Sequence, residues 1–329
     1  MKKIAFGFVF IVVVAILSYS IIQRQTTPKS PTLTKVVISE AFEVFLHAPL
    51  WIAYEKGFFK EEGLDVTINI AGGDEKSWAA VLNNDAQFAV GDPVFVAISG
   101  EKDQPGVVVA SILNGMPFWG VAKNESVPEI KKPEDLGSYS VATLPAPSTN
   151  YALQRKMFES AGIKPNIKEV AFGGLLPALY AGEVDIALEF EPNVSTAVEN
   201  GNRIVYSLAD YYPDFAFTGL IALPDYVAQH KDTVQKVVNA LQKANAYIRT
   251  DTVSAAAILA KKFNVSQSIA ENGLKNLIGK NAIQADTITG KNAWIQAVNV
   301  RVELSDLQKD APYENYVITS FSERAKSAY

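Results

Sequence analysis

The chain has 329 residues, of which 48% are hydrophobic and 20% charged, and its formal net charge is −5 at pH 7. This length exceeds what one hydrophobic core usually supports, so we expect two globular lobes; the composition and the lack of like-charge blocks exclude a disordered chain and a nucleic-acid-binding tail. The sequence contains no cysteine, which excludes a disulfide scaffold, a thiolate metal site, a cysteine nucleophile and a lipid-modified cysteine.

Residues 1–22 have the pattern of an export signal. Two lysines precede an apolar run that begins at Ile4 and has few polar interruptions. Two outcomes fit this pattern: cleavage after Ser20, or retention of the segment as a membrane anchor, since its length is sufficient to cross a bilayer. Residues 23–34, rich in Thr, Pro and Ser, are expected to form a flexible linker.

From residue 35 onward, short apolar runs alternate with glycine-containing turns and helical segments, which predicts a parallel sheet with helices on both faces. The first expected strands are 36–38, 66–70, 87–90, 107–113 and 119–122, and the helices between them begin near residues 49, 74 and 92. A second unit follows, with strands at 140–144, 167–171 and 185–190 and helices at 148–160 and 175–180. Strands at 204–206 and 217–223 return the chain to the first unit, and four further helices are expected at 231–249, 253–263, 266–277 and 291–304.

Two neighbouring segments carry a family resemblance. His47-Ala-Pro-Leu-Trp-Ile-Ala53 is followed by Gly57-Phe-Phe-Lys-Glu-Glu-Gly-Leu-Asp-Val66. Together they resemble the start of the nitrate/sulfonate/taurine and thiamine-pyrimidine family of substrate-binding proteins that feed ABC importers. Glu189-Phe-Glu-Pro192 is also similar to the Trp-Glu-Pro segment of sulfonate and taurine receptors, with Phe190 where tryptophan is usual.

This resemblance implies the α/β fold of type II periplasmic binding proteins, in which two lobes joined by two crossings close on a ligand by a hinge motion. Lobe I would comprise residues 35–120 and 215–329, with the helical C-terminal part packing on it. Lobe II would comprise residues 121–214.

Ligands in open α/β sheets bind beyond the carboxyl ends of the strands, where loops meet helix N-termini. The polar residues and aromatic rings near these ends give the expected ligand-binding residues, which are Phe45, His47, Gly73, Trp78, Asp92, Asn114, Trp119, Ser148, Thr149, Asn150, Glu189 and Glu191. His47 also matches a histidine position of pyrimidine-binding relatives. A structural alternative stays open for each: helix capping for the small polar residues, a turn for Gly73, and core packing for the aromatic rings.

Acidic residues dominate the strand-end loops. Glu40, Glu43, Asp74, Asp92, Glu189 and Glu191 stand against a single basic residue, Lys76, which lies inside an expected helix. A sulfonate or nitrate would need cationic or dense amide donors, whereas an amine-bearing heterocycle would pair with carboxylates and stack on aromatic rings. We therefore expect a nitrogenous, partly aromatic ligand such as a thiamine-related pyrimidine. The alternative is an alkanesulfonate, taurine or nitrate. The preference for a nitrogenous ligand disappears if the acidic side chains cap helices or face solvent.

The expected function is that of an extracytoplasmic solute-binding component, in the periplasm or on the outer face of the cell membrane, with an ABC permease and its ATPase as partners. We expect no catalysis and no cofactor. We expect no metal site because the two histidines lie far apart in sequence, and no nucleic-acid partner because the chain is acidic. Two alternatives remain: an enzyme like the eukaryotic relatives that make the thiamine pyrimidine, although their cysteine-rich stretch is missing, and a sensory module anchored by residues 4–22.

Overall fold

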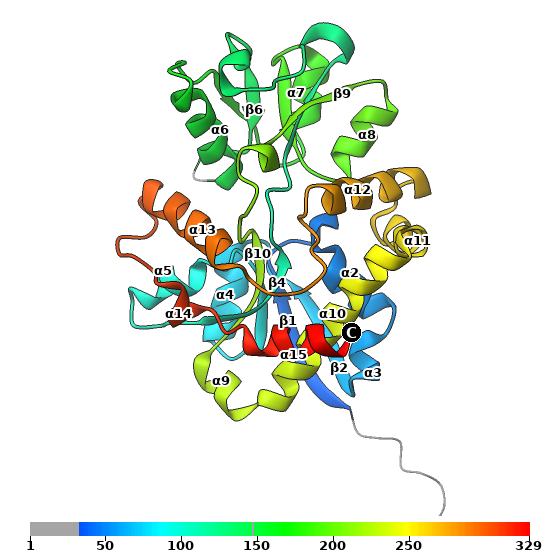
Figure 1. Ribbon diagram of the computed structural model, residues 1–329, viewed down its shortest axis with the longest axis vertical. Coiled ribbons are helices and arrows are strands. Elements are labelled where there is room, and N and C mark those ends of the chain that lie inside the picture. Colours follow the sequence, from blue (N-terminus) through cyan, green and yellow to red (C-terminus); the bar gives the residue numbers. More distant parts are fainter. Residues whose placement is uncertain (1–32, 147) are drawn as a thin grey trace, which may run out of the picture. The chain divides into compact units, whose positions relative to one another are not determined.

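The computed structural model describes residues 33–146 and 148–329 (Figure 1). The segment 1–22, expected to be an export signal or an anchor, and residues 23–32 of the expected linker lie outside the described residues. Within the part that is described, no helix is both long and apolar enough to span a bilayer.

Two five-stranded sheets organise the chain. The first has the order β2-β1-β3-β10-β4 and the second the order β7-β6-β8-β5-β9. We call the elements that pack on the first sheet lobe I and those that pack on the second lobe II. The strands of lobe I are β1 (Thr34–Glu40), β2 (Leu64–Ile70), β3 (Phe88–Gly91), β4 (Val107–Leu113) and β10 (Thr218–Ala222). Those of lobe II are β5 (Trp119–Ala122), β6 (Val141–Thr143), β7 (Ile167–Glu169), β8 (Ile186–Glu189) and β9 (Arg203–Ser207).

Both sheets are mixed, which corrects the expectation of purely parallel sheets. In lobe I, β1 pairs in parallel with β2 and β3, whereas β10 runs antiparallel to β3 and β4. In lobe II, β6 is parallel to β7 and β8, whereas β5 runs antiparallel to β8 and β9. The two reversed strands, β5 and β10, are those that enter directly from the other lobe. They need no crossover helix, so the parallel direction is not imposed on them.

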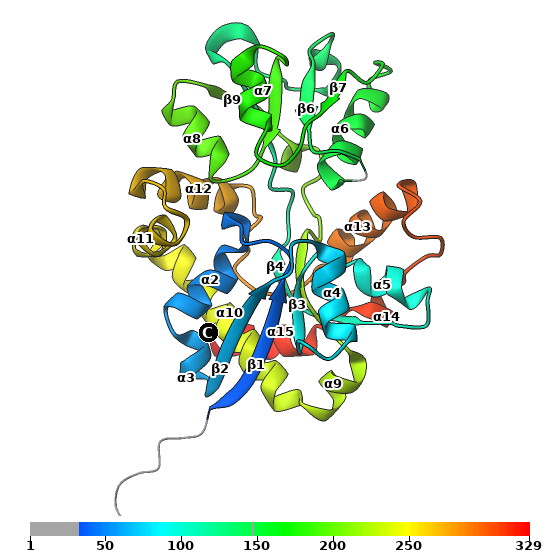
Figure 2. The same ribbon diagram turned by 180° about the vertical axis from the view of Figure 1, so that it is seen from behind.

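Helices cover both sheets, and the C-terminal helices pack on lobe I (Figures 1 and 2). Lobe I contains α2 (Ala48–Glu55), α3 (Phe58–Glu61), α4 (Asp74–Leu82), α5 (Phe95–Gly100), α9 (Pro224–Gln229), α10 (Lys231–Thr250), α11 (Thr252–Phe263), α12 (Gln267–Gly279), α13 (Lys291–Glu303), α14 (Tyr313–Tyr316) and α15 (Ser320–Ala328). Lobe II contains α6 (Thr149–Ser160), α7 (Leu175–Ala181) and α8 (Asn193–Glu199). In α10, Val234, Val237, Val238 and Leu241 recur every three or four residues and are buried, which makes this helix amphipathic.

The segments 114–118 and 211–217 connect the lobes. The first follows β4 and leads into β5, so Trp119 and Gly120, expected in lobe I, pair in the second sheet. The C-terminal region covers the outer edge of β4, because Ile318 donates to the carbonyl of Val108 and Ser111 donates to the carbonyl of Thr287. The ends of β1 and β3 and the start of β10 border a cavity.

Candidate functional site

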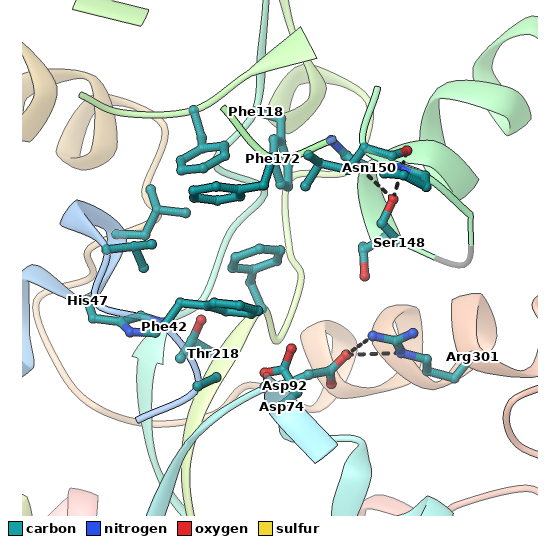
Figure 3. A pocket seen from close by; sticks show the side chains of 18 residues that line it. Phe42, His47, Asp74, Asp92, Phe118, Ser148, Asn150, Phe172, Thr218 and Arg301 are labelled. Carbon is teal, nitrogen blue, oxygen red and sulfur yellow. Dashed lines mark hydrogen bonds and ion pairs between the residues drawn. The ribbon is translucent and has the colours of Figure 1, made fainter. Parts of the chain in front are cut away.

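A cavity of about 400 Å³ lies between loops of the two lobes (Figure 3). This volume is typical of sites for small molecules. Lobe I supplies Ala41, Phe42, Val44, Leu46, His47, Asp74, Asp92, Thr218 and Arg301; lobe II supplies Leu144, Pro145, Ser148, Thr149, Asn150, Phe172 and Phe190; the connecting segments supply Phe118 and Phe217.

Five phenylalanine rings form a continuous cluster along one wall of the cavity. Phe42 stacks on Phe172 across the two lobes, with ring centroids 6.3 Å apart and 12° between the planes. Phe172 contacts Phe190 at 5.9 Å, Phe190 contacts Phe118 at 5.8 Å, and Phe118 contacts Phe217 at 5.6 Å. Phe42 is 43% exposed and Phe172 is 66% exposed, although both belong to this cluster. Exposed aromatic rings that line a cavity indicate a surface for an apolar or aromatic ligand.

His47 enters the cavity wall from the N-terminus of α2. Its Nδ1 lies 2.7 Å from Oε1 of Glu40, which also accepts a hydrogen bond from Nε1 of Trp51 at 3.1 Å. Glu40 is fully buried at the end of β1, and its Oε2 has no partner among the described residues. Because Glu40 engages Nδ1 and so fixes the orientation of the ring, Nε2 is the nitrogen that is left to contact a ligand.

Two aspartates and an arginine form a polar part of the cavity wall (Figure 3). Oδ1 of Asp74 accepts the backbone N–H of Asp92 at 2.7 Å, and Oδ1 of Asp92 accepts that of Val94 at 2.8 Å. Oδ2 of Asp92 accepts a hydrogen bond from Nε of Arg301 at 2.9 Å and a second one from Nη2. Nη1 of Arg301 donates to Oδ2 of Asp306 at 3.0 Å. The guanidinium is thus held by two carboxylates.

Burial and neighbouring charges shift the pKa values of the groups in this wall. Burial, and secondarily repulsion by Asp92, raise the pKa of Asp74 above its ordinary value. Burial alone would lower the pKa of the Arg301 guanidinium, but attraction to Asp92 and Asp306 more than offsets this, so its pKa is raised. Arg301 therefore stays cationic, and Asp74 holds its proton more readily than a carboxyl in water.

Lobe II contributes hydrogen-bonding groups from the N-terminus of α6. Oγ of Ser148 lies 2.8 Å from Oδ1 of Asn150 and 3.2 Å from the carbonyl oxygen of Leu144, which are the two acceptors available to its single proton. Asn150 is buried, and its Nδ2 has no hydrogen-bond partner in the described part of the chain. A buried amide donor at the cavity wall is costly unless an acceptor is supplied, and a bound ligand would supply one.

Five of the expected ligand-binding residues line this cavity: His47, Asp92, Ser148, Thr149 and Asn150. Four others do not line this cavity and lie within lobe I or in the second sheet. Phe45 packs against Phe263, Trp78 donates from Nε1 to Oγ of Ser99 at 2.8 Å, Gly73 forms the turn before α4 through a bond to the carbonyl of Ala41, and Trp119 is buried in β5.

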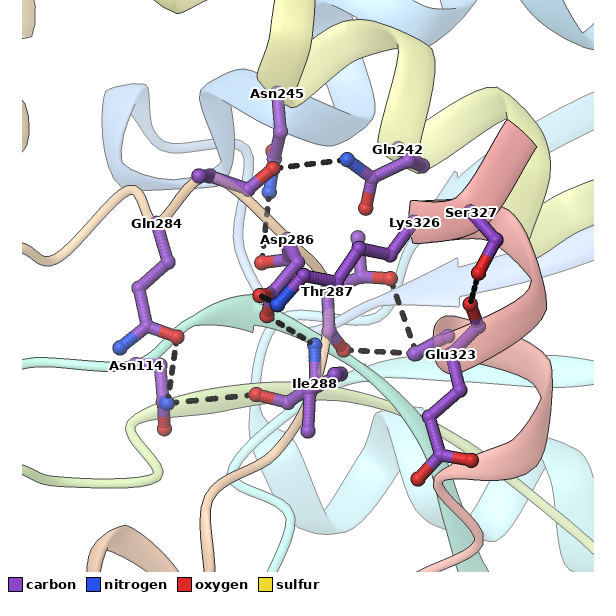
Figure 4. A network of polar contacts seen from close by, with 12 residues as sticks. Asn114, Gln242, Asn245, Gln284, Asp286, Thr287, Ile288, Glu323, Lys326 and Ser327 are labelled. Atoms are coloured by element: carbon purple, nitrogen blue, oxygen red, sulfur yellow. Dashed lines mark hydrogen bonds and ion pairs between the residues drawn. The ribbon is translucent and has the colours of Figure 1, made fainter. Parts of the chain in front are cut away.

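Asn114 borders a second, more polar cavity of about 350 Å³ and belongs to a network of polar contacts (Figure 4). Its Nδ2 donates to Oε1 of Gln284 at 2.9 Å, and Asp286 in the same loop accepts from Ile288 and Lys326. In residues 33–146 and 148–329 no group of three or more His, Cys, Asp or Glu side chains has the geometry to hold a metal ion.

Glu189 and Glu191 flank Phe190, which lines the first cavity, but neither carboxylate is part of the lining. Oε2 of Glu189 accepts from the backbone N–H of Phe190 at 3.2 Å and from Nδ2 of Asn193 at 3.0 Å, and burial raises the pKa of Glu189 to about 7. Burial also raises the pKa of Glu191, which accepts from the N–H of Ser195 and from Asn276.

Phe172, Phe217 and Arg301 are among the lining residues that were not identified in the sequence. Phe172 and Phe217 line the cavity, and Arg301 brings a cation that the count of basic residues in the strand-end loops omitted. Phe172 follows β7 within Ala-Phe-Gly-Gly, so the strand-end rule is sufficient to find it. Arg301 lies in α13, far along the sequence from the strand ends that border the cavity, and the sequence gives no signal for it.

Comparisons with known proteins place the chain in a family. The family described as NMT1/THI5 like matches residues 44–255. YtlA of Bacillus subtilis (strain 168), whose name describes a binding protein, is 25% identical over 306 residues, which cover 90% of this chain and 91% of YtlA.

Two solved structures share the fold. The periplasmic aliphatic sulphonate binding protein SsuA from Escherichia coli has a TM-score of 0.69 at 14% identity and covers 88% of this chain and 93% of SsuA. The periplasmic nitrate-binding protein NrtA from Synechocystis PCC 6803 has a TM-score of 0.64 at 16% identity and covers 91% of this chain and 90% of NrtA. The expected periplasmic-binding-protein fold is therefore confirmed.

Proposed function

The chain belongs to the NMT1/THI5-like family, and on this premise we propose that it is the substrate-binding component of an ABC importer and acts outside the cytoplasmic membrane. The fold that it shares with the sulphonate-binding SsuA and the nitrate-binding NrtA supports this role. The export pattern of residues 1–22 supports the location. Its partners would be a small ligand, a permease and the ATPase of that permease.

We further propose that the ligand is released unaltered. The binding-protein name of YtlA supports this. The cavity supports it too, because the acceptors within reach of the Ser148 hydroxyl are the carbonyl of Leu144 and Oδ1 of Asn150 rather than His47, so the histidine does not activate it as a nucleophile.

The proposed ligand is a small nitrogenous heterocycle, such as a thiamine-related pyrimidine. One observation carries this proposal: five phenylalanine rings and the carboxylate of Asp74 line the same cavity. An aromatic ring would stack on the exposed faces of Phe42 and Phe172, and an amino group would donate to Asp74. Nδ2 of Asn150 and Nε2 of His47 would bind ring nitrogens or a hydroxyl group.

Sulfonates and nitrate are the alternative ligand class, which the names of SsuA and NrtA favour. An anion in this cavity would lie near Asp74 and Asp92, and the charge of Arg301 is already shared between Asp92 and Asp306. Repulsion in a partly desolvated cavity would therefore oppose its binding.

Isothermal titration calorimetry with the hydroxymethyl aminopyrimidine of thiamine, ethanesulfonate and nitrate tests the ligand class. We expect the pyrimidine to bind and His47→Gln to weaken binding by about 10- to 100-fold, the value of one buried hydrogen bond to a charged or polar group. The matched control is His230→Gln, since His230 is exposed, and it should change nothing. Binding of ethanesulfonate or nitrate without the pyrimidine would refute the ligand class, and a chemically converted pyrimidine in the mixture would refute the binding role.

A further inference from the structure

Among the described residues that line the cavity, Arg301 is the one that is permanently cationic, and carboxylates accept hydrogen bonds along two edges of its guanidinium. Oδ2 of Asp92 accepts hydrogen bonds from both Nε and Nη2, and Oδ2 of Asp306 accepts one from Nη1. Three of the five N–H donors of the guanidinium are thus used within the protein. Arg301 comes from α13, beyond residues 44–255 that match the family, so the family match says nothing about it.

The balance of charge around the guanidinium is negative. Asp92 and Asp306 contact it, and Asp74 lies next to Asp92 through the N–H···O bond at 2.7 Å. Asp92 and Arg301 line the cavity and Asp306 contacts Arg301, so two carboxylates stand against one guanidinium even before Asp74 is counted. Because charges interact strongly in a site that excludes water, this balance decides the sign of charge that the cavity accepts.

We propose that Asp92 determines the charge specificity of the cavity: by holding Arg301 it withdraws the guanidinium from the ligand and excludes anions. This inference deepens the proposed function and rests on its assignment of this cavity as the ligand site. Loss of the Asp92 charge would release Nε and Nη2 of Arg301 and make the cavity a site for a sulfonate, whose oxygens match the guanidinium donors.

The substitution Asp92→Asn isolates this effect. An asparagine keeps the Oδ1 that accepts the N–H of Val94 and keeps the backbone N–H that donates to Asp74. It places a neutral group beside Arg301, while Asp306 still orients Nη1. The local backbone is thus retained, and the change is confined to the charge and the acceptor facing the guanidinium.

The test is calorimetry with ethanesulfonate on the purified protein and its variants. Asp92→Asn should bind ethanesulfonate about ten-fold or more tighter than the unsubstituted protein, the gain of one charge-assisted hydrogen bond. The double variant Asp92→Asn/Arg301→Gln should lose this gain. Asp232→Asn, which makes the same charge change on the exposed face of α10, should behave like the unsubstituted protein.

No gain in Asp92→Asn, or a gain that persists in the double variant, would overturn the proposal. If Asp92→Asn does not fold, Asp92→Ser replaces it, since serine also removes the carboxylate that holds Nε and Nη2 of Arg301 and offers a hydroxyl oxygen to the N–H of Val94; a gain there supports the proposal and its absence overturns it. An unsubstituted protein that binds neither the pyrimidine nor ethanesulfonate, with a gain in Asp92→Asn, would refute the proposed ligand and support this inference.

Discussion

Asn276 of α12 donates a hydrogen bond of 2.6 Å from Nδ2 to Oε1 of Glu191, which lies just after β8 in lobe II. Since α12 packs on α11 in lobe I and on α8 in lobe II, this bond joins the two lobes. Two exposed ion pairs, Lys156–Glu303 at 2.6 Å and Lys280–Asp210 at 2.5 Å, also cross between them. Of these contacts, the Asn276 bond is the one made to a fully buried carboxylate.

Removal of this donor should destabilise the protein. Asn276→Ala leaves Oε1 of Glu191 without its partner in a buried position, and we expect the free energy of unfolding to fall by about 1–3 kcal/mol. Urea denaturation measures this change. The matched control is Asn239→Ala, because Asn239 donates to Glu62, a carboxylate that Lys243 also contacts. An equal or smaller loss in Asn276→Ala than in Asn239→Ala would contradict the expectation.

A glycine allows the close approach of Asp74 to the end of β3. A Cβ at Gly91 would lie 2.5 Å from Oδ1 of Asp74, so Gly91→Ala should displace this carboxylate and break its bond to the N–H of Asp92. We expect weaker binding of the aminopyrimidine, by about ten-fold or more if Asp74 binds its amino group. Gly279→Ala is the control, since its Cβ would meet nothing within 4 Å. Calorimetry compares the two variants, and unchanged affinity in Gly91→Ala would exclude Asp74 from the ligand contacts.

The phenylalanine cluster predicts a separation between affinity and stability. Phe172 is 66% exposed, so Phe172→Ala should leave the thermal midpoint almost unchanged. It should nevertheless weaken binding of the aminopyrimidine by about two- to ten-fold, because one aromatic stacking contact is lost. Tyr180→Ala removes another exposed ring of lobe II outside the cavity and should leave affinity intact. Equal affinities of both variants would show that the cluster does not contact the ligand.

Much of the secondary structure could be predicted from the sequence. The apolar runs at 107–113 and 119–122 match β4 and β5 residue for residue, because an uninterrupted buried run admits few alternatives. The direction of β5 and β10 could not be predicted, since local periodicity contains no information about which lobe precedes a strand. The short helices α3 and α8 were not identified, because four to seven residues give too few repeats of the helical period.

The residues that line the candidate site were predicted only where local rules apply. His47 and Ser148 lie at helix N-termini that follow strands, and both line the cavity. Trp78 also lies in a helix that follows a strand, but its indole N–H donates to Oγ of Ser99 in the core. Only the tertiary structure brings this partner near. Arg301 shows the converse case: 209 residues separate it from Asp92, and no spacing rule relates residues at that separation.

Glu189 predicts a dependence of stability on pH. Burial raises its pKa from the ordinary 4.5 to about 7 in the folded protein. Between these two values the unfolded chain has lost this proton while the folded protein retains it, so the stability that this group contributes is fully present below 4.5 and declines as pH rises to about 7. The full difference is about 3 kcal/mol. Glu189→Gln retains an oxygen that accepts from Phe190 and Asn193 but does not titrate.

The free energy of unfolding of Glu189→Gln and of the unsubstituted protein should therefore be compared by urea denaturation at pH 5 and pH 8. The variant should gain relative to the unsubstituted protein as pH rises, by up to about 3 kcal/mol at pH 8. Glu183→Gln, a change at an exposed carboxylate paired with Lys168, should show a small difference that varies little over this range, because exposed ion pairs contribute little. A difference between Glu189→Gln and the unsubstituted protein that stays constant from pH 5 to pH 8 would mean that Glu189 titrates with the same pKa in the folded and unfolded states.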